Sequence, residues 1–209
     1  MVNIVNFTGN TLLDELIDSS LAIVFYGPAA SGKTTLLLTI ASNVCREILC
    51  VYVSTEETVH YEQVAKTPSK YEGVLFTEAF DMDTFLKSAI ATYMMSPKYI
   101  FIDSINSLFR LEPLKENTLT KQAFITSLLL ETARRNKGKL FASAQVRVGE
   151  KGELEASGFK IIDYYFDLIL SVFIGEGGKR YVKPVKTPVP ARFEKVGFTI
   201  SNTGLMWND

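Results

Sequence analysis

Short apolar runs alternate with longer amphipathic stretches along the first two thirds of the chain. Strand-like runs occupy residues 21–26, 48–53, 99–102 and 139–144, with a shorter one at 74–76. Continuous apolar runs of this length are typical of strands buried on both faces of a parallel sheet. Between them, apolar residues at helical spacing predict helices at 12–17, 33–46, 59–66, 81–95, 104–110 and 118–136. This alternation predicts an α/β fold, with a mostly parallel central sheet and helices on both of its faces.

The pattern changes towards both ends of the chain. Residues 3–7 could add a short edge strand at the start. Residues 146–163 are polar and glycine-rich, and we interpret them as a loop. Three strand-like segments joined by turn residues then follow at 166–174, 180–186 and 195–200. They predict a C-terminal antiparallel β-hairpin extension of the sheet. No internal repeat or long linker divides the sequence, so we expect residues 1–209 to form a single domain.

The motif Gly-x-x-x-x-Gly-Lys-Thr lies between the first apolar run and the helix that follows it. Its residues and the next one are Gly27, Pro28, Ala29, Ala30, Ser31, Gly32, Lys33, Thr34 and Thr35. Between a strand and a helix, this spacing is typical of a phosphate-binding loop, whose small residues let backbone N–H groups surround a polyphosphate. The lysine can reach the β and γ oxygens, and the Thr34 hydroxyl can bind Mg²⁺. We therefore predict binding of ATP and Mg²⁺, against the alternative of a simple glycine-containing turn.

Polar residues that end the other apolar runs are candidates for the chemistry, because ligands bind at the carboxyl ends of such strands. Asp103 is a candidate Mg²⁺ ligand, with helix capping as the alternative. Glu56 and Glu57 follow the strand that we expect beside the phosphate-loop strand, where a carboxylate could orient water for hydrolysis. Gln145 has an amide suited to contacting the γ-phosphate. Both glutamates could instead be solvated residues at the start of a helix.

Composition and charge narrow the class of protein. The apolar fraction is 47% and the formal net charge is −1, which argues against nucleic-acid binding by the whole surface. No signal-peptide pattern or apolar run of about 20 residues occurs, so we expect no membrane segment and a cytoplasmic location. The two cysteines, Cys45 and Cys50, fall in a predicted helix and strand. We interpret them as reduced thiols rather than a disulfide framework.

Together these elements resemble the RecA-type ATPase core, and most closely the RadA branch of recombinases and their archaeal paralogues. The similarity covers nearly the whole chain, and its most specific segment after the phosphate loop is 101–110 (FIDSINSLFR). Further matches are 7–16 (FTGNTLLDEL), 54–56 (STE), 144–146 (AQV), 178–180 (GKR) and 198–205 (FTISNTGL). The resemblance implies that Glu56 is the catalytic glutamate. It also implies that Gln145 senses the γ-phosphate and couples it to a DNA-binding loop.

Departures from the recombinase pattern change the expected function. The N-terminal helix-hairpin-helix domain and the Phe-x-x-Ala linker of full recombinases are not seen. The family's two DNA loops have few basic residues in this chain: the candidates are Arg110, Arg147, Lys151 and Lys160. Residues 146–163 carry a net charge of −1, because Glu150, Glu153, Glu155 and Asp163 outnumber their three cations. We therefore expect weak single-stranded DNA binding and no autonomous strand exchange.

Lys183 and Lys186 lie on the predicted closing hairpin. In RecA-like and KaiC-like proteins, basic residues at this place reach the nucleotide of a neighbouring subunit, as an arginine finger does. The resemblance implies the same trans-acting role for these lysines, and with it an oligomer. The alternative is a solvated strand face with alternating lysines.

The sequence and this resemblance thus predict a Mg²⁺-dependent, slow ATPase that assists homologous recombination and DNA repair. Its hydrolysis is either stimulated by DNA or indifferent to it. Its expected partners are single-stranded DNA and a RadA-type recombinase. The first alternative is a KaiC-like regulatory ATPase that acts on proteins without a DNA role, favoured by the paired Glu56 and Glu57 and the acidic second loop. The second is a switch that binds ATP and barely hydrolyses it.

Overall fold

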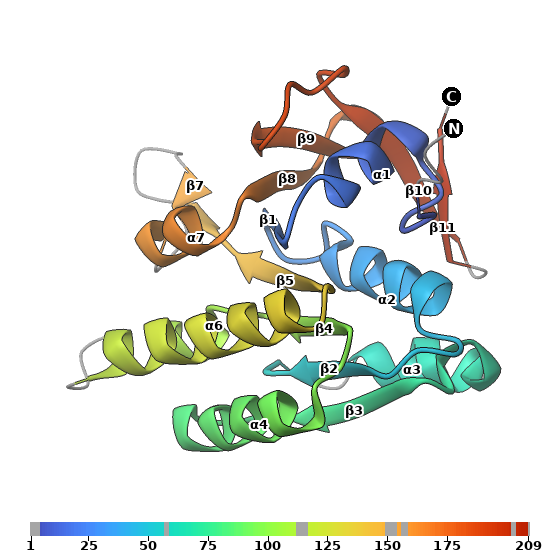
Figure 1. Cartoon of the computed structure of the whole chain (residues 1–209). Coiled ribbons are helices and arrows are strands. Elements are labelled where there is room, and N and C mark those ends of the chain that lie inside the picture. Colours follow the sequence, from blue (N-terminus) through green and yellow to red (C-terminus); the bar gives the residue numbers. More distant parts are fainter. Residues whose placement is uncertain are drawn as a thin grey trace.

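The computed structural model confirms the predicted α/β architecture (Figure 1). It describes residues 5–56, 59–111, 117–148, 154–155, 159–201 and 204–208, and only the backbone of 59–60, 110–111, 147–148 and 154–155. Nine strands form the central sheet, in the order β11-β10-β9-β8-β1-β5-β4-β2-β3. Six of them are parallel: β1 (Ala22–Gly27), β2 (Cys50–Ser54), β3 (Val74–Glu78), β4 (Tyr99–Asp103), β5 (Lys139–Gln145) and β8 (Leu168–Ile174).

The C-terminal part extends this sheet in antiparallel fashion, as the sequence predicts. The added strands are β9 (Arg180–Lys186), β10 (Val196–Ser201) and β11 (Gly204–Trp207). The short 3₁₀ turn η2 (Glu176–Gly178) joins β8 to β9. A separate two-stranded ladder pairs β6 (Arg147–Val148) with β7 (Leu154–Glu155). Strand β11 is an element that the sequence pattern did not predict.

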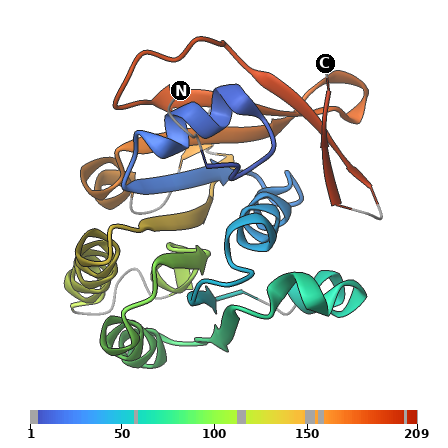
Figure 2. The same ribbon diagram turned by 45° about the vertical axis from the view of Figure 1, so that its right-hand side comes forward.

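Helices cover both faces of the sheet because its strands are apolar on both sides (Figures 1 and 2). One face packs against α1 (Thr11–Asp18), α2 (Lys33–Val44), α3 (Val59–Lys66) and the 3₁₀ helix η1 (Pro68–Tyr71). The other packs against α4 (Met82–Met95), α5 (Ser107–Leu111), α6 (Thr118–Arg135) and α7 (Phe159–Tyr165). Strand β1 shows the alternation: Ile23 and Phe25 enter the first core, and Ala22 and Val24 enter the second. No helix in these ranges is long and apolar enough to cross a membrane.

Local signals account for several element boundaries. Asp81 caps α4 through a reciprocal capping box with Thr84, which satisfies N–H groups of the first turn. The spacing of apolar residues in this helix predicts burial of Phe85, Ala89 and Ile90. Phe85 and Ala89 are buried, but Ile90 is exposed, because it lies on the solvent side of the helix. The edge strand predicted at 3–7 is wrong for its described part, since residues 5–7 form no strand. Phe7 is instead a buried core side chain.

The two cysteines form a disulfide, which corrects the prediction of reduced thiols. Cys45 is the C-cap residue of α2 and Cys50 begins β2, with a Cα–Cα distance of 5.9 Å. Both side chains are fully buried. The bridge therefore joins the C-terminal end of the helix that follows the phosphate-binding motif to the strand that leads to Glu56. The sequence does not show this pairing, because it depends on how tightly the chain turns between helix and strand.

We expect reduction of the Cys45–Cys50 bridge to lower the free energy of unfolding by about 2 kcal/mol, because it releases a closed loop with a sequence separation of five residues. Denaturant unfolding with and without a reductant measures this difference. A variant with both Cys45→Ser and Cys50→Ser is the control and should not respond to reductant. Two thiols that react in the denatured, unreduced protein would contradict the bridge.

Candidate functional site

The phosphate-binding motif forms a tight loop at the carboxyl end of β1, closed around its own lysine. The Lys33 ammonium donates to the Gly27 carbonyl at 3.0 Å and to the Pro28 carbonyl at 2.7 Å. Helix α2 begins at Lys33, and its N-cap residue is Gly32. Because glycine has no side chain to cap the first turn, the N-terminal N–H groups of α2 face the loop without a side-chain acceptor. This arrangement provides an anion-binding helix terminus beside a cation.

The two motif glycines are required for different reasons. Gly32 has φ +105°, a left-handed conformation that favours glycine, and an added Cβ would also crowd Ile200 and Phe198 at 3.0–3.1 Å. At Gly27 an added Cβ would lie 2.0 Å from the Val172 carbonyl oxygen of the neighbouring strand β8. We expected Gly27 to allow close approach to a phosphate. The structure shows that it allows close packing of β1 against β8.

Further features of the loop fit a triphosphate with Mg²⁺. Ser31 Oγ is buried, and it has no hydrogen-bond partner among the residues that the structure describes. Thr34, the predicted metal ligand, is half-buried in the first turn of α2. The next residue, Thr35, turns to another side, where its hydroxyl accepts a 3.4 Å hydrogen bond from Gln63 Nε2. A buried polar atom without a partner and helix N–H groups without a side-chain cap are what an anion would satisfy.

Asp103 is held in a buried polar cluster at the end of β4. Its carboxylate accepts hydrogen bonds from the Tyr52 hydroxyl at 2.9 Å and from the Ser143 hydroxyl. Burial, and then the charge of Asp103, raise the pKa of Tyr52 well above its ordinary value, so this hydroxyl keeps its proton and donates. The peptide bond between Asp103 and Ser104 is cis. Both hydroxyl donors lie on the neighbouring strands, whereas a capping role would need a donor at a helix N-terminus.

Mg²⁺ is usually held by one or two carboxylates together with substrate phosphates and water. No group of three or more His, Cys, Asp or Glu side chains within the described ranges could form a complete protein cage. Thr34 and Asp103 therefore fit a metal ion that arrives with a nucleotide, rather than one held by the protein alone.

Glu56 lies just beyond β2, and both of its carboxylate oxygens accept hydrogen bonds. Ser104 Oγ donates to Oε1, and Gln145 Nε2 donates to Oε2 at 2.6 Å. We expected the strand before Glu56 to lie beside the phosphate-loop strand, and this is wrong. The neighbours of β1 are β5 and β8, and β2 lies beyond β5 and β4. The side chain nevertheless contacts Gln145, whose strand β5 is adjacent to β1. Glu57 lies outside the described residues.

Gln145 ends β5 directly opposite Gly27 of the phosphate loop. Its side chain reaches Glu56, and its backbone is bonded by the side chain of Asn106. The structure therefore brings together the predicted sensor and the predicted catalytic glutamate. It places them at the same edge of the sheet as the loop that contains Lys33.

Sequence reasoning missed four polar residues that orient the predicted ones: Tyr52, Ser104, Asn106 and Ser143. A weak signal exists for two of them. Tyr52 and Ser143 interrupt apolar strands, and a buried hydroxyl needs a hydrogen-bond partner. Nothing in the spacing of Ser104 and Asn106 indicates which side chains they contact, because those contacts join residues 39 to 48 positions apart.

The predicted DNA-contacting residues are only partly described. Arg110 lies in α5 and Arg147 in β6, with only their backbones described, and Lys151 lies outside the described residues. Lys160 is exposed. It belongs to helix α7, so the end of the segment interpreted as a loop is helical. The reason is that Ile162 and the following Phe166 pack into the second core, and Ile161 is also buried.

The two candidate trans-acting lysines differ in their contacts. Lys186 is 3.6 Å from the Asp163 carboxylate and also donates to the Asp163 carbonyl, which ties β9 to α7. Lys183 is exposed and lies opposite Ser171, in the middle of β8. Among the residues that the structure describes, Lys183 has no ion-pair partner that it would have to leave, and its side chain is open to solvent.

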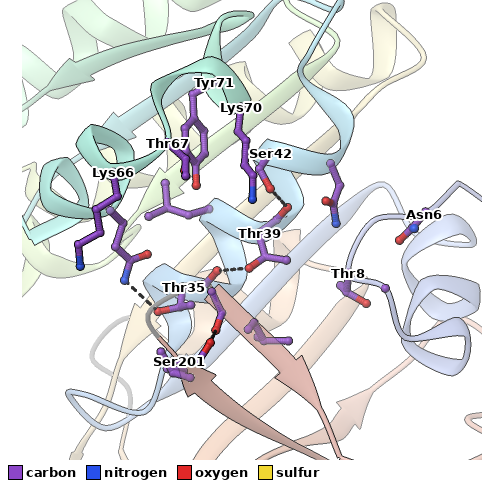
Figure 3. Close-up of a pocket in the computed structure, with 17 residues that line it drawn as sticks. Asn6, Thr8, Thr35, Thr39, Ser42, Lys66, Thr67, Lys70, Tyr71 and Ser201 are labelled. Atoms are coloured by element: carbon purple, nitrogen blue, oxygen red, sulfur yellow. Dashed lines mark hydrogen bonds between the residues drawn. The ribbon is translucent and has the colours of Figure 1, made fainter.

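A groove of about 880 Å³ opens beside Thr35 and runs along α2 (Figure 3). One wall is the polar side of that helix, with Thr35, Thr39 and Ser42. Lys70 and Tyr71 point into it from η1, as Figure 3 shows. The described side chains that line it include lysines but no carboxylate. Burial raises the pKa of Tyr71, which therefore remains a neutral hydroxyl.

Comparison with known proteins identifies the family. The chain is 25% identical over 195 residues to DNA repair and recombination protein RadB of Methanocaldococcus jannaschii, covering 86% of this chain and 90% of that protein. It is 30% identical over 159 residues to DNA repair and recombination protein RadB of Thermococcus sibiricus, covering 69% of each chain. The chain belongs to the RadB family. This membership agrees with the resemblance to RadA-type proteins noted in the sequence. No family model matches the chain.

Proposed function

We propose that this RadB-family chain binds ATP with Mg²⁺ at residues 27–35 and hydrolyses it slowly, in the service of DNA repair and recombination. The observation that carries the proposal is the contact between Glu56 and Gln145 at the edge of the sheet where the phosphate loop lies. A candidate base and a candidate sensor share one hydrogen bond there. The names of the two relatives support the biological role.

Lys33, Thr34 and Asp103 would hold the phosphates and the metal. The Lys33 ammonium would exchange the Gly27 and Pro28 carbonyls for phosphate oxygens, which as anions are stronger acceptors. The Thr34 hydroxyl and the Asp103 carboxylate would hold Mg²⁺, Asp103 being already oriented by Tyr52 and Ser143. Bound Mg²⁺ supplies neutralisation of the charge on the β and γ oxygens.

Glu56 would accept a proton or hydrogen bond from the attacking water. Both of its oxygens are already bonded, by Ser104 and by Gln145. Release of Oε2 by the Gln145 amide would make Glu56 a stronger base towards water, and a γ-phosphate oxygen is an acceptor that could draw the amide away. Turnover is then slow unless this exchange is favoured, and a ligand that repositions the segment after Gln145 accelerates it.

The groove along α2 would take the base and sugar of the nucleotide. It begins at Thr35, directly after the proposed metal ligand, and its volume of about 880 Å³ is ample for a nucleoside. The mixture of hydroxyls, amides and aliphatic side chains such as Leu205 can satisfy the polar edge of a base and pack against its ring.

Single-stranded DNA and a RadA-type recombinase are the partners we propose. Weak DNA binding follows from the few cations in the segments after α5 and β5. In an oligomer, the exposed Lys183 is better placed than Lys186 to act on a neighbouring subunit, since Lys186 would first have to leave Asp163.

We expect ATP hydrolysis to rise on addition of single-stranded DNA and the stimulation to shrink as salt increases, because phosphate contacts release counterions. Steady-state phosphate release with and without DNA, at low and moderate salt, measures this. Lys33→Ala is the inactive control. Hydrolysis that is indifferent to DNA at every salt concentration would favour a KaiC-like, protein-directed ATPase. Nucleotide binding without measurable hydrolysis would favour a binding-only switch.

A further inference from the structure

Asn106 is the residue before α5, and two hydrogen bonds join its side chain to Gln145, the last residue of β5. Its Nδ2 group donates to the Gln145 carbonyl at 2.9 Å, and its Oδ1 atom accepts from the Gln145 N–H at 3.0 Å. The side chain is buried, with 3% of its surface exposed. One carboxamide thus satisfies both backbone polar groups of the proposed sensor residue.

The position of Asn106, in the turn just beyond β4, explains why a side chain takes this role. Strands β4 and β5 pair up to Ile102 and Ala142, and the Ile105 N–H still donates to the Ser143 carbonyl at 2.8 Å. Beyond that point the chain turns away into α5, so β5 loses its partner on this side. The Asn106 amide replaces the missing peptide group and extends the ladder to Gln145. On the other side, β5 remains paired with β1 at Gly27.

The direction of the Gln145 side chain depends on this pair of hydrogen bonds, which we call the Asn106 clamp. With its backbone held from both sides, Gln145 directs Nε2 towards Glu56 Oε2 at 2.6 Å. The clamp also connects two segments of the chain. Asn106 immediately precedes α5, which leads to residues 112–116, and Gln145 immediately precedes residues 146–158. A displacement of either segment would be transmitted to Gln145 through these two hydrogen bonds.

We propose that Asn106 is a positioning residue for hydrolysis, which sets the Gln145–Glu56 contact and makes the segments after α5 and β5 respond together. This inference rests on the proposed ATPase function. It concerns the chemical step, because the two hydrogen bonds of the clamp go to Gln145 and not to the phosphate loop. Nucleotide binding and hydrolysis should therefore respond differently to the replacement of Asn106.

Asn106→Ala should lower kcat by about 10- to 100-fold, since loss of the clamp misplaces groups that must act within a fraction of an ångström. The Kd for ATP should stay within about twofold, and DNA should no longer stimulate turnover. Asn136→Ala is the matched control. Asn136 also donates to a backbone carbonyl, that of Thr132 at 2.8 Å, but at the opposite end of β5. It should keep kcat and DNA stimulation.

Asn106→Asp separates positioning from a loss of folding. An ionised aspartate at this position can accept a hydrogen bond from the Gln145 N–H, but its second oxygen faces the Gln145 carbonyl, which is also an acceptor. Only the protonated form can donate a hydrogen bond to that carbonyl. Burial of the site and the facing Gln145 carbonyl should raise the pKa of the new carboxyl group. The ratio of its kcat to that of wild type should rise about tenfold from about pH 8 to about pH 5.5, whereas the ratio for Asn106→Ala stays flat.

The outcomes distinguish this inference from the proposed function. If wild type does not hydrolyse ATP under any condition, the proposed function fails first. If wild type hydrolyses ATP and Asn106→Ala keeps its kcat, or if the Asn106→Asp ratio does not change with pH, the positioning role is overturned. A lower kcat with unchanged Kd, together with recovery of Asn106→Asp in acid, supports it.

Discussion

Replacing Glu56 by glutamine should lower ATP turnover by about 10²- to 10⁴-fold while leaving nucleotide affinity nearly unchanged, because it removes a positioned proton acceptor. The substitution keeps the shape of the side chain, and Ser104 can still donate to its oxygen. What it removes is the negative charge between Ser104 and Gln145. Single-turnover hydrolysis measures the chemical step, and equilibrium titration with a fluorescent ATP analogue measures binding.

Glu78→Gln is the matched control for this experiment. Glu78 ends β3, opposite Ser54 of β2, and so lies at the same edge of the sheet but on its outermost strand. It should retain turnover. Full hydrolysis by Glu56→Gln would remove Glu56 from the mechanism, and the contact between Glu56 and Gln145 would then be structural.

The parallel strands could be predicted because their burial on both faces leaves continuous apolar runs in the sequence. Strand order could not be predicted in the same way. It depends on how the helical crossovers pass over the sheet, which the apolar pattern does not encode. The expected place of β2 beside the phosphate-loop strand failed for this reason, since β5 and β4 lie between β1 and β2.

The candidate site was predictable where residues end strands and was not predictable where residues support them. Asp103, Glu56 and Gln145 stand out because each follows an apolar run. Ser143 and Asn106 act through contacts with residues about 40 positions away, and only the register of β4 against β5 brings those residues together. Helix α7 was hidden for a different reason, because its two buried residues, Ile161 and Ile162, follow closely on a polar, glycine-rich segment.

Replacing Lys33 by alanine should weaken ATP binding by at least about 100-fold, since hydrogen bonds to a charged group contribute about 1.5–3 kcal/mol each and this ammonium would make more than one to the phosphates. The ammonium also bonds the Gly27 and Pro28 carbonyls, so the substitution loosens the loop itself. Wild type should therefore gain thermal stability on addition of ATP and Mg²⁺, and Lys33→Ala should not.

Lys139→Ala tests whether this effect belongs to the phosphate loop or to any buried lysine. Lys139 also donates to two backbone carbonyls, those of Asp18 at 2.9 Å and Ser20 at 2.6 Å, but at the amino end of β5. Burial lowers the pKa of Lys139. Burial disfavours the charged form of Lys139 in the folded protein, which lowers the free energy of unfolding while the lysine is charged. This free energy is recovered as pH rises from the lowered pKa towards the ordinary pKa of lysine. Lys139→Ala should change the free energy of unfolding but leave ATP affinity intact. Equal loss of ATP affinity in Lys139→Ala and Lys33→Ala would contradict a specific role for Lys33.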